Sequence, residues 1–249
     1  MSKQTMKVDL YLTPFPFELI SMDDKVVVAI DVLRSSTSTC AALMAGARGV
    51  IPTPGPGEAR EMWSRIGSDM AVLAGERDNL RIENFQLGNS PTEFTAESVG
   101  DKYVVMTTSN GTAIFGMAKK AALVLSAGLV NISKVADRIA SEDRDLLIVC
   151  AGQGGGFSIE DTICAGMLIH ILSTEHNKKL KLNDAGSIAL LLARTNQTAL
   201  EKTIQHGEHG QRLTSQGFGD DVIIATATNS MPILPELVDG RLVVQKAKE

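Results

Sequence analysis

The sequence predicts an α/β fold: a layered sheet with helices on both of its faces, open to a division into two subdomains. Short runs of Val, Ile and Leu alternate along the chain with segments of helical spacing, which is typical of a sheet covered by crossover helices. The run 26–30 is apolar throughout, as in a strand buried on both faces. With 22 glycines and only 4% aromatic residues, the composition favours tight turns around a site over a stacking surface.

The elements follow in order from these patterns. Strands are expected at 7–12, 26–30, 50–53, 70–74, 103–106, 121–125, 146–150 and 242–244, where short β-branched or apolar runs lie between turn residues. Helices are expected at 36–45, 58–66, 110–118, 132–139, 159–172, 185–194 and 198–206, from Ala, Leu and Met content or 3.6-residue spacing. The alternating run 7–12 reads as an edge strand. The chain 1–249 reads as one unit, with a candidate subdomain boundary near 176–185, where the pattern changes.

Composition and charge narrow the class of protein. The 24 basic and 29 acidic residues give a net charge of −5 without a basic patch, so we expect no nucleic-acid partner. No apolar run approaches the roughly 20 residues of a membrane span, and residues 1–7 contain no apolar core of a secretion signal. Three cysteines without a C-x-x-C spacing read as reduced thiols of a cytoplasmic protein. A homodimer is expected only from the frequency of two-fold assemblies.

Four polar segments follow predicted strands, and ligands of open α/β sheets bind beyond the carboxyl ends of strands. The segments are 31–39, 75–77, 106–112 and 150–161. Each combines charged, hydroxyl or glycine residues with the start of a loop or helix. The sequence therefore predicts a ligand site at this edge of the sheet.

The first segment places a carboxylate, an arginine and three hydroxyls together: Asp31, Arg34, Ser35, Ser36 and Thr37. Backbone N–H groups at the start of a helix favour an anion, and a guanidinium can bind phosphate or sulfonate oxygens in a fork. The alternative is a helix cap beside an Arg34–Asp31 ion pair. One hydroxyl suffices for a cap, so the cluster favours an anion site.

The second segment is the pair Glu76 and Arg77 at the end of a strand. An isolated pair of this kind is usually a surface ion pair of little energetic value. Here it opens a polar connection, 75–91, and long connections of this kind are often functional. Asn89 and Ser90 close the connection and are candidates for substrate binding, with a simple turn before Pro91 at a helix start as the alternative.

The third segment is the turn Thr108, Ser109, Asn110, Gly111 and Thr112. Asn-Gly alone would predict a β-hairpin. The run that follows has helical spacing, so a second anion-binding turn between a strand and a helix is the preferred interpretation.

The fourth segment is rich in glycine, including Gly152, and glycines let a ligand approach the backbone closely. Ser158 and Asp161 have the spacing of a capping box. Glu160 and Asp161 could instead provide oxygen ligands to Mg²⁺, which binds one or two carboxylates and retains water. The sequence leaves these two interpretations open.

Several familiar mechanisms lack their residues. There is no Walker G-x-x-x-x-G-K-[ST] loop, and a cysteine-phosphatase loop would need arginine where Gly156 stands. An Asp-x-Asp strand end is absent, because Leu33 occupies the second position. His206 and His209 are a weak candidate zinc pair, since no third ligand accompanies them.

The ordered set of segments resembles the 2-phosphosulfolactate phosphatase family from residue 8 to 172, and more weakly from 206 to 232. The matching strings are Val-Ala-Ile-Asp31-Val-Leu-Arg34, Leu-Ala-Gly-Glu76-Arg77, Leu-Gly-Asn89-Ser90-Pro91, Thr-Thr-Ser-Asn110-Gly-Thr112 and Phe-Ser-Ile-Glu160-Asp161. Two positions depart from the family pattern: Ala113 replaces a basic residue, and 84–86 replaces Gly-Phe-Asp. The first departure removes an anion contact and the second an acidic ligand.

The resemblance implies Mg²⁺-dependent hydrolysis of (R)-2-phospho-3-sulfolactate to 3-sulfolactate and phosphate, a step that feeds coenzyme M synthesis in some organisms. Asp31, Arg34, Glu76 and Arg77 are then the expected catalytic residues. Expected metal ligands are Asp31, Glu160 and Asp161, with Glu76 as a further candidate. The hydroxyl clusters, Asn89, Ser90 and Gly152 would hold the small anionic substrate.

The nucleophile stays open between an activated water and Asp31 itself. Two other functions also stay open. One is a Mg²⁺-dependent phosphatase of other small phosphorylated acids, and the other is a non-catalytic binder of an anionic metabolite.

Overall fold

The computed structural model describes residues 5–14, 20–196 and 198–245. Of residues 1–7, on which the expectation about a secretion signal rests, the first four lie outside the described residues. No helix in the described ranges is both long and apolar enough to cross a membrane.

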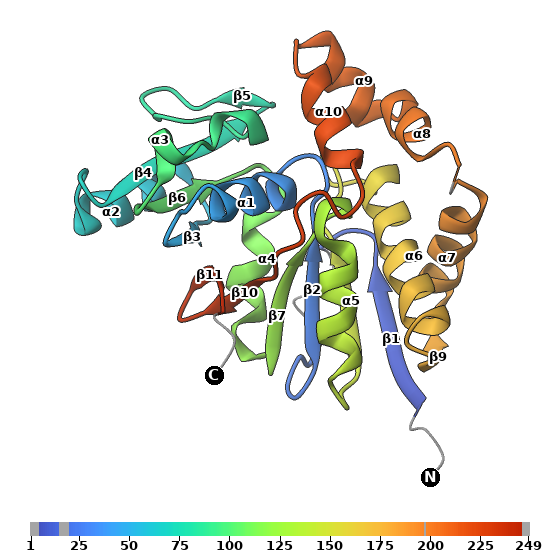
Figure 1. Cartoon of the computed structure of the whole chain (residues 1–249). Coiled ribbons are helices and arrows are strands. Elements are labelled where there is room, and N and C mark those ends of the chain that lie inside the picture. Colours follow the sequence, from blue (N-terminus) through green and yellow to red (C-terminus); the bar gives the residue numbers. More distant parts are fainter. Residues whose placement is uncertain (1–4, 15–19, 197, 246–249) are drawn as a thin grey trace.

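A single mixed sheet runs through the described part of the chain (Figure 1), with eleven strands in the order β5-β4-β6-β3-β11-β10-β7-β2-β8-β1-β9. The strands are β1 (Thr5–Tyr11), β2 (Val26–Ile30), β3 (Gly49–Pro52), β4 (Ala71–Arg77), β5 (Leu80–Arg81), β6 (Tyr103–Thr107), β7 (Leu123–Ala127), β8 (Leu146–Cys150), β9 (Lys179–Leu182), β10 (Pro235–Val238) and β11 (Arg241–Val244).

The helices are α1 (Ser35–Met44), α2 (Pro56–Ile66), α3 (Ala96–Val99), α4 (Thr112–Met117), α5 (Ile132–Ala140), α6 (Ile159–Thr174), α7 (Asp184–Thr195), α8 (Leu200–His206), α9 (Glu208–Ser215) and α10 (Gly219–Thr226). Short 3₁₀ turns are η2 (Pro91–Glu93), η3 (Ala118–Lys120) and η4 (Leu129–Asn131).

Strand β2 shows why the sheet is covered on both faces. Val26, Val28 and Ile30 pack in one apolar cluster with α5, α6 and α7. Val27 and Ala29 point to the opposite face and pack in a second cluster with α1 and α4. Alternate residues of a strand face opposite sides of the sheet, so the continuous apolar run indicates burial on both. The predicted α/β class with helices on both faces is confirmed.

The sheet has two parallel blocks joined by an antiparallel hairpin. β4, β6 and β3 are parallel to one another, as are β7, β2, β8, β1 and β9. Hairpin β10–β11 lies between the blocks, where β10 pairs with β7 and β11 with β3 in antiparallel fashion. The segment 176–185, taken from sequence as a candidate boundary, adds β9 beside β1.

The prediction of an edge strand at 7–12 is wrong, because β1 lies between β8 and β9. Its residues alternate between exposed or half-buried and fully buried positions. The alternation therefore arises from one face that helices leave partly uncovered and not from a missing neighbour strand. The short strand β9 takes the edge position instead.

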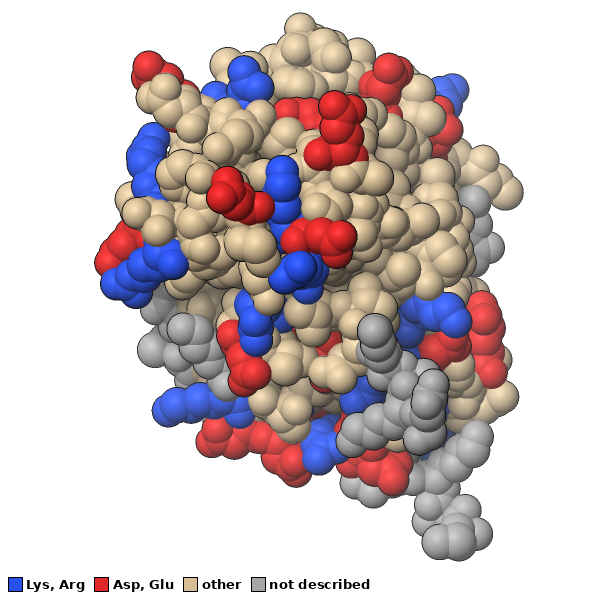
Figure 2. All heavy atoms as spheres, turned by 60° about the vertical axis from the view of Figure 1, so that its left-hand side comes forward, with Lys and Arg blue, Asp and Glu red and all other residues tan. Residues whose placement is uncertain are grey.

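Helices α8, α9 and α10 lie above the carboxyl ends of the strands in Figure 1, opposite the end where the N-terminus emerges. Ile204, Leu213, Val222 and Ala225 anchor them in the same apolar cluster as β1, β2 and β8. The sequence predicts α8 but neither α9 nor α10. On the face shown in Figure 2, acidic and basic side chains are interspersed, without a broad patch of one sign.

Candidate functional site

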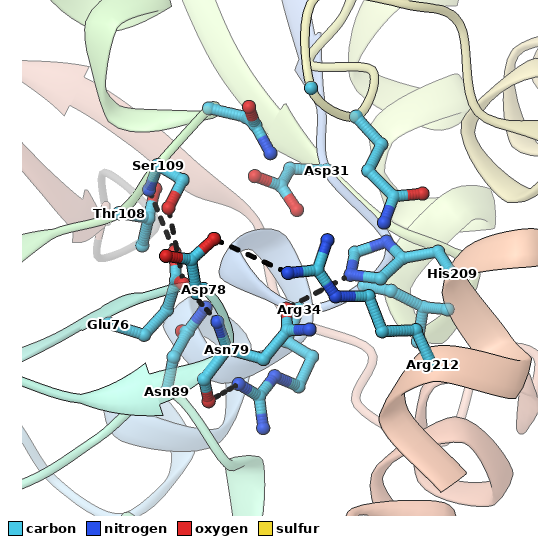
Figure 3. Close-up of a pocket in the computed structure, with 14 residues that line it drawn as sticks. Asp31, Arg34, Glu76, Asp78, Asn79, Asn89, Thr108, Ser109, His209 and Arg212 are labelled. Carbon is cyan, nitrogen blue, oxygen red and sulfur yellow. Dashed lines mark hydrogen bonds and ion pairs between the residues drawn. The ribbon is translucent and has the colours of Figure 1, made fainter. Parts of the chain in front are cut away.

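A cavity of about 110 Å³ lies at the carboxyl ends of β2, β4, β6 and β8, beneath α9 (Figure 3). Its lining residues come from six separate parts of the chain: Asp31, Leu33, Arg34, Glu76, Asp78, Asn79, Asn89, Thr108, Ser109, Asn110, Gln153, Gly154, His209 and Arg212. The predicted strand-end segments therefore do meet at one place. In Figure 3, Asp31 points into the space between Ser109 on one side and His209 with Arg212 on the other.

Asp31 directly follows β2 and is held by the first turn of α1. The Ser35 N–H donates to Asp31 Oδ1 at 3.2 Å, and the Asp31 N–H donates to Ser36 Oγ at 3.1 Å. The start of α1 thus binds a carboxylate of the protein itself. Thr37 Oγ1 donates to the Val32 carbonyl. The hydroxyls of Ser36 and Thr37 therefore fix this loop, and none of the hydroxyl residues of α1 lines the cavity.

Burial raises the pKa of Asp31 to about 6, because a desolvated carboxylate loses its hydration. The negative charges of Glu76 and Glu160 raise the pKa further, whereas the Ser35 N–H and the nearby His209 lower it. Asp31 is therefore a carboxyl group that changes protonation near neutral pH. Groups of this kind occur often at catalytic sites.

Arg34 lines the cavity but is fully engaged by the protein. Its Nη1 donates to Asp221 Oδ2 at 2.7 Å, and its Nη2 donates to the Asn79 carbonyl at 2.7 Å. Both side chains of the ion pair are nearly inaccessible, at 2% and 3% exposure. The guanidinium also stacks on Phe218, 4.4 Å from the ring centroid, and Ser90 Oγ donates to Asp221 Oδ1 at 2.6 Å. Arg34 and Ser90 thus join α10 to the site.

Glu76 lies at the cavity and satisfies backbone donors. Its carboxylate accepts from the N–H of Asn79 at 2.8 Å and from the N–H of Ser109 at 2.7 Å. Asp78 and Asn79 both have positive φ, which is the geometry of a two-residue turn between paired strands. Glu76 therefore fixes the tip of hairpin β4–β5 to the loop after β6.

Arg77 points away from the cavity and is not among its lining residues. Its Nη1 donates to the Glu76 carbonyl at 2.7 Å and its Nη2 to Thr107 Oγ1 at 3.1 Å. The structure thus separates two side chains that the sequence placed together. Successive strand residues face opposite sides, which is the reason for this separation.

The turn after β6 contributes Thr108, Ser109 and Asn110 to the cavity. Thr108 and Thr112 form reciprocal contacts, each N–H donating to the other's Oγ1 at 3.3 and 3.4 Å. Gly111 packs directly against Asp31: a Cβ at Gly111 would lie 2.2 Å from Asp31 Oδ2. Gly111 has ordinary αR backbone angles, so the carboxylate is what requires glycine there.

Gly111→Ala is therefore expected to displace the Asp31 carboxylate. A misplacement of about 1 Å at a reacting group costs on the order of 10²-fold in rate, and we expect a loss of that size in kcat. Gly116 on the same helix is the matched control, since a Cβ there meets nothing within 4 Å. Gly116→Ala should keep full activity and gain about 0.5–1 kcal/mol in unfolding free energy. Equal activity of the two variants would contradict the assigned contact.

Asp161 holds the backbone and does not line the cavity. It accepts from the Val32 N–H at 2.8 Å and from the Gly152 N–H at 3.1 Å. Burial and the charges of Glu160 and Asp31 raise its pKa well above the usual range. Gly152 has φ +64, and a Cβ there would lie 2.2 Å from the Gly156 carbonyl, so its glycine is required by the backbone. Gln153 and Gly154 are the cavity residues of this loop.

Glu160 reaches the site through His209, whose Nδ1 lies 3.0 Å from Glu160 Oε1. The other ring nitrogen, Nε2, faces Asn79 Oδ1 at 3.3 Å. Asn79 Nδ2 donates to Gln216 Oε1, and Gln216 Nε2 donates to the Asp78 carbonyl, so the orientations of both amides are fixed. Each ring nitrogen of His209 therefore faces a side-chain oxygen, and these two contacts fix the orientation of the ring at the cavity.

Asn89 carries an unsatisfied acceptor at the cavity. Its side chain is 4% exposed, and Oδ1 has no hydrogen-bond partner. A buried amide oxygen without a donor is costly, so this atom is suited to a ligand. Within the described residues, no three His, Cys, Asp or Glu side chains converge as a metal cluster. Asp31 and Asn89 are lining residues whose oxygen atoms could serve a divalent cation.

The structure brings seven of the residues singled out from sequence to the cavity: Asp31, Arg34, Glu76, Asn89, Thr108, Ser109 and Asn110. The others do not line it: Ser35, Ser36, Thr37, Arg77, Ser90, Gly111, Thr112, Gly152, Glu160 and Asp161. From the sequence, His209 was interpreted only as a candidate zinc ligand together with His206. The two histidines are separated here, since His206 Nδ1 contacts the Lys202 carbonyl and is exposed.

Sequence reasoning missed Asp78, Asn79, Arg212 and Asp221. Arg212 and Asp221 lie on the unpredicted helices α9 and α10. The available signal was the polar stretch 207–221, which has acidic residues early in each helix and glycines before them. Asp78 and Asn79 lie in the polar connection 75–91, whose sequence shows neither helical nor strand periodicity.

Comparison with known proteins gives consistent results. A family model described as 2-phosphosulpholactate phosphatase matches residues 12–240. A protein of Carboxydothermus hydrogenoformans is 34% identical over 245 residues, which are 98% of this chain and 99% of the relative. One from Clostridium acetobutylicum is 32% identical over 96% of this chain and 100% of its own length. One from Thermotoga maritima is 33% identical over 89% and 93%.

All three relatives carry the name "Probable 2-phosphosulfolactate phosphatase". Their alignments extend over nearly the whole of both chains, and the matched range contains every cavity residue described above. The chain belongs to the 2-phosphosulpholactate phosphatase family.

Proposed function

We propose that this protein hydrolyses the phosphate monoester of 2-phosphosulfolactate, giving 3-sulfolactate and phosphate in a Mg²⁺-dependent reaction. The observation that carries the proposal is the position of Asp31, a buried carboxyl group with a pKa near 6, at the centre of the cavity. Family membership and the names of the relatives support the substrate.

The residues present are suited to Mg²⁺. This ion binds through one or two carboxylates, other oxygen atoms and substrate phosphate, and the lining residues Asp31 and Asn89 carry oxygens of these kinds, with Asn89 Oδ1 lacking a partner. Glu76 is a third oxygen source, although backbone N–H groups already occupy its carboxylate. The bound ion would neutralise phosphate oxygens and lower the pKa of a water molecule.

The protein's own groups would bind and orient the ester. Thr108, Asn110 and Gln153 line the space that Asp31 faces, and Ser109 lines it with its hydroxyl donating to Glu76 Oε2 at 3.2 Å. Oriented donors of this kind stabilise charge that develops in the transition state. His209, whose two ring nitrogens contact Glu160 and Asn79, lines the same cavity as Asp31. Glu160 and Asp161 act behind the cavity as positioning residues.

Two nucleophiles fit this arrangement. Either water attacks phosphorus, or Asp31 attacks and forms an aspartyl phosphate that water then hydrolyses. Acid quenching during turnover, followed by mass spectrometry of the peptide that contains Asp31, distinguishes them. A mass increase of one phosphoryl group on that peptide identifies Asp31 as the nucleophile.

The direct test is phosphate release from racemic 2-phosphosulfolactate with and without Mg²⁺, beside phosphoglycolate, phospholactate and p-nitrophenyl phosphate. We expect Mg²⁺-dependent turnover of the sulfonated ester well above that of the others. Comparable turnover of the unsulfonated esters would instead assign a phosphatase of general small phosphorylated acids. No turnover of any ester by the folded protein, together with tight binding of 3-sulfolactate, would assign a non-catalytic binder of an anionic metabolite.

A further inference from the structure

We propose that Arg212 on α9 is the residue that recognises the sulfonate of the substrate, so that it determines specificity at the cavity. This inference rests on the proposed function, because it names the group that distinguishes the sulfonated ester from simpler phosphate esters. It rests on the contrast between two arginines that share one cavity.

Arg34 and Arg212 are the arginines among the residues that line the cavity. Arg34 is 3% exposed, and the buried carboxylate of Asp221 neutralises its charge. Both of its terminal nitrogens already donate to protein oxygens. Arg34 therefore has little capacity left for an external anion.

Arg212, in contrast to Arg34, is exposed and only weakly paired. Its side chain is 46% exposed, and it forms an ion pair with Asp78 through a 3.3 Å contact between Nη2 and Asp78 Oδ1. The Asp78 side chain is itself 87% exposed, and pairs of this kind contribute about 0–1 kcal/mol. Figure 3 shows the Arg212 guanidinium directed across the cavity toward Asp78 at the tip of hairpin β4–β5. A ligand anion can therefore replace Asp78 at little energetic cost.

Electrostatics at the cavity require such a cation. The substrate carries a phosphate, a carboxylate and a sulfonate, which together bring roughly four negative charges at neutral pH. The lining already includes the carboxylates of Asp31, Glu76 and Asp78. A Mg²⁺ ion would offset charge at the phosphate but not at the other end of the substrate. The exposed guanidinium of Arg212 can offset that second charge.

The chemistry of the two groups is also matched. A sulfonate presents acceptor oxygens in a compact group, and a guanidinium presents paired N–H donors that bind two oxygens at once. A lysine would keep the charge but lose the fork. Asp78 then has a role as the resting partner, because it holds Arg212 at the cavity mouth until the sulfonate replaces it.

The test compares 2-phosphosulfolactate with 2-phospholactate, which lacks only the sulfonate, in wild type, Arg212→Gln and Arg212→Lys. Loss of a hydrogen-bonded charged contact corresponds to about 10- to 150-fold in affinity. We expect Arg212→Gln to lower kcat/KM for the sulfonated ester by that factor, mainly through KM, and to change it less than about 3-fold for phospholactate. Arg212→Lys should lie between wild type and Arg212→Gln.

Asp78→Asn is the second variant, because it removes the competing resting partner. It should raise kcat/KM for the sulfonated ester by up to about 5-fold, in line with an exposed ion pair. Arg65→Gln is the matched control, since Arg65 also forms an exposed pair, with Glu61, but lies on α2 outside the cavity. It should change neither substrate's kinetics. An equal loss on both substrates, or no loss, in Arg212→Gln would overturn the proposal.

Binding of 3-sulfolactate and of lactate, measured by calorimetry, separates this proposal from the proposed function. If wild type lacks turnover but binds 3-sulfolactate, and Arg212→Gln loses that binding, the assignment of Arg212 stands and the hydrolase function fails. If wild type hydrolyses the ester and Arg212→Gln keeps the same affinity for 3-sulfolactate, the assignment of Arg212 fails and the function stands.

Discussion

Asp31→Asn is expected to lower phosphate release by at least about 10³-fold and, at the same time, to stabilise the metal-free protein at pH 8. Activity falls because the cavity loses the carboxylate that every version of the proposed mechanism requires. Stability rises because the wild-type carboxylate is ionised at pH 8 in a buried position that disfavours its charge. The Asn amide oxygen can still accept the Ser35 N–H that now reaches Asp31 Oδ1.

The sign and size of the expected change in unfolding free energy follow from the linkage between protonation of Asp31 and folding. The native pKa of Asp31 is raised from 3.8 to about 6, so the native state holds its proton more tightly than the unfolded chain does. The stability from that proton is complete below about pH 3.8 and is lost as pH rises through about 6. A shift of this size corresponds to roughly 3 kcal/mol. We therefore expect Asp31→Asn to gain up to about 3 kcal/mol at pH 8 and almost nothing at pH 4.

Thermal unfolding in chelator at pH 4, 6 and 8 measures this effect, with a gain in Tm of about 5–10 °C expected at pH 8. Asp143→Asn is the control, because Asp143 is an exposed carboxyl group and its removal should shift stability by less than about 0.5 kcal/mol. A destabilised Asp31→Asn protein at pH 8 would show that the carboxylate is favourably held in the native state, contrary to the assigned pKa.

Asp221→Ala is expected to destabilise the protein by about 3–5 kcal/mol, since it leaves the Arg34 charge buried without a partner. Asp221 Oδ2 lies 2.7 Å from Arg34 Nη1, and Oδ1 accepts from Ser90 Oγ at 2.6 Å. One side chain therefore connects α10 to the loop after β2 and to the turn at η2. Its removal should also loosen α10 and lower activity, although Asp221 does not line the cavity.

Urea unfolding of the single variants and of the double variant Arg34→Met with Asp221→Leu gives the test. Replacing both members by apolar residues removes the unpaired charge, so the double variant should be more stable than Asp221→Ala. Asp220→Ala is the matched control on the same helix, because Asp220 is exposed and its loss should cost less than about 1 kcal/mol. A loss below about 1 kcal/mol for Asp221→Ala as well would contradict a buried, uncompensated arginine.

The regular part of the fold was accessible from sequence because local patterning decides it. Strands such as β2 and β8 are apolar runs buried on both faces, and a helix such as α5 buries Ile132, Val135, Ala136 and Ile139 at helical spacing. Of hairpin β10–β11, the sequence predicted β11 but not β10. Strand β10 begins at a proline and is only four residues long. The hairpin lies between β7 and β3, and this position depends on contacts between residues far apart in the sequence, which local sequence patterns do not predict.

The site divides in the same way. Asp31 and Thr108 follow strands and Glu76 lies at the end of one, and the parallel arrangement alone brings strand ends together. The direction of each side chain was not accessible, which is why Arg77 was grouped with Glu76 although it points elsewhere. The two predicted anion-binding turns instead receive Asp31 and Glu76, carboxylates of the chain itself. Hydroxyl-rich turns attract negative charge. The sequence does not show whether that charge belongs to a bound ligand or to a carboxylate of the protein itself.

The hairpin that joins the two parallel blocks also sets an order for assembly during synthesis. β3 and β7 each present a free backbone edge until residues 235–244 have left the ribosome, because β11 and β10 are the strands that cover them. Leu242 pairs with Val50 across most of the chain's length, and contacts so distant in sequence form slowly. A nascent chain that pauses before the hairpin is complete therefore carries two open strand edges, which are templates for pairing with other chains.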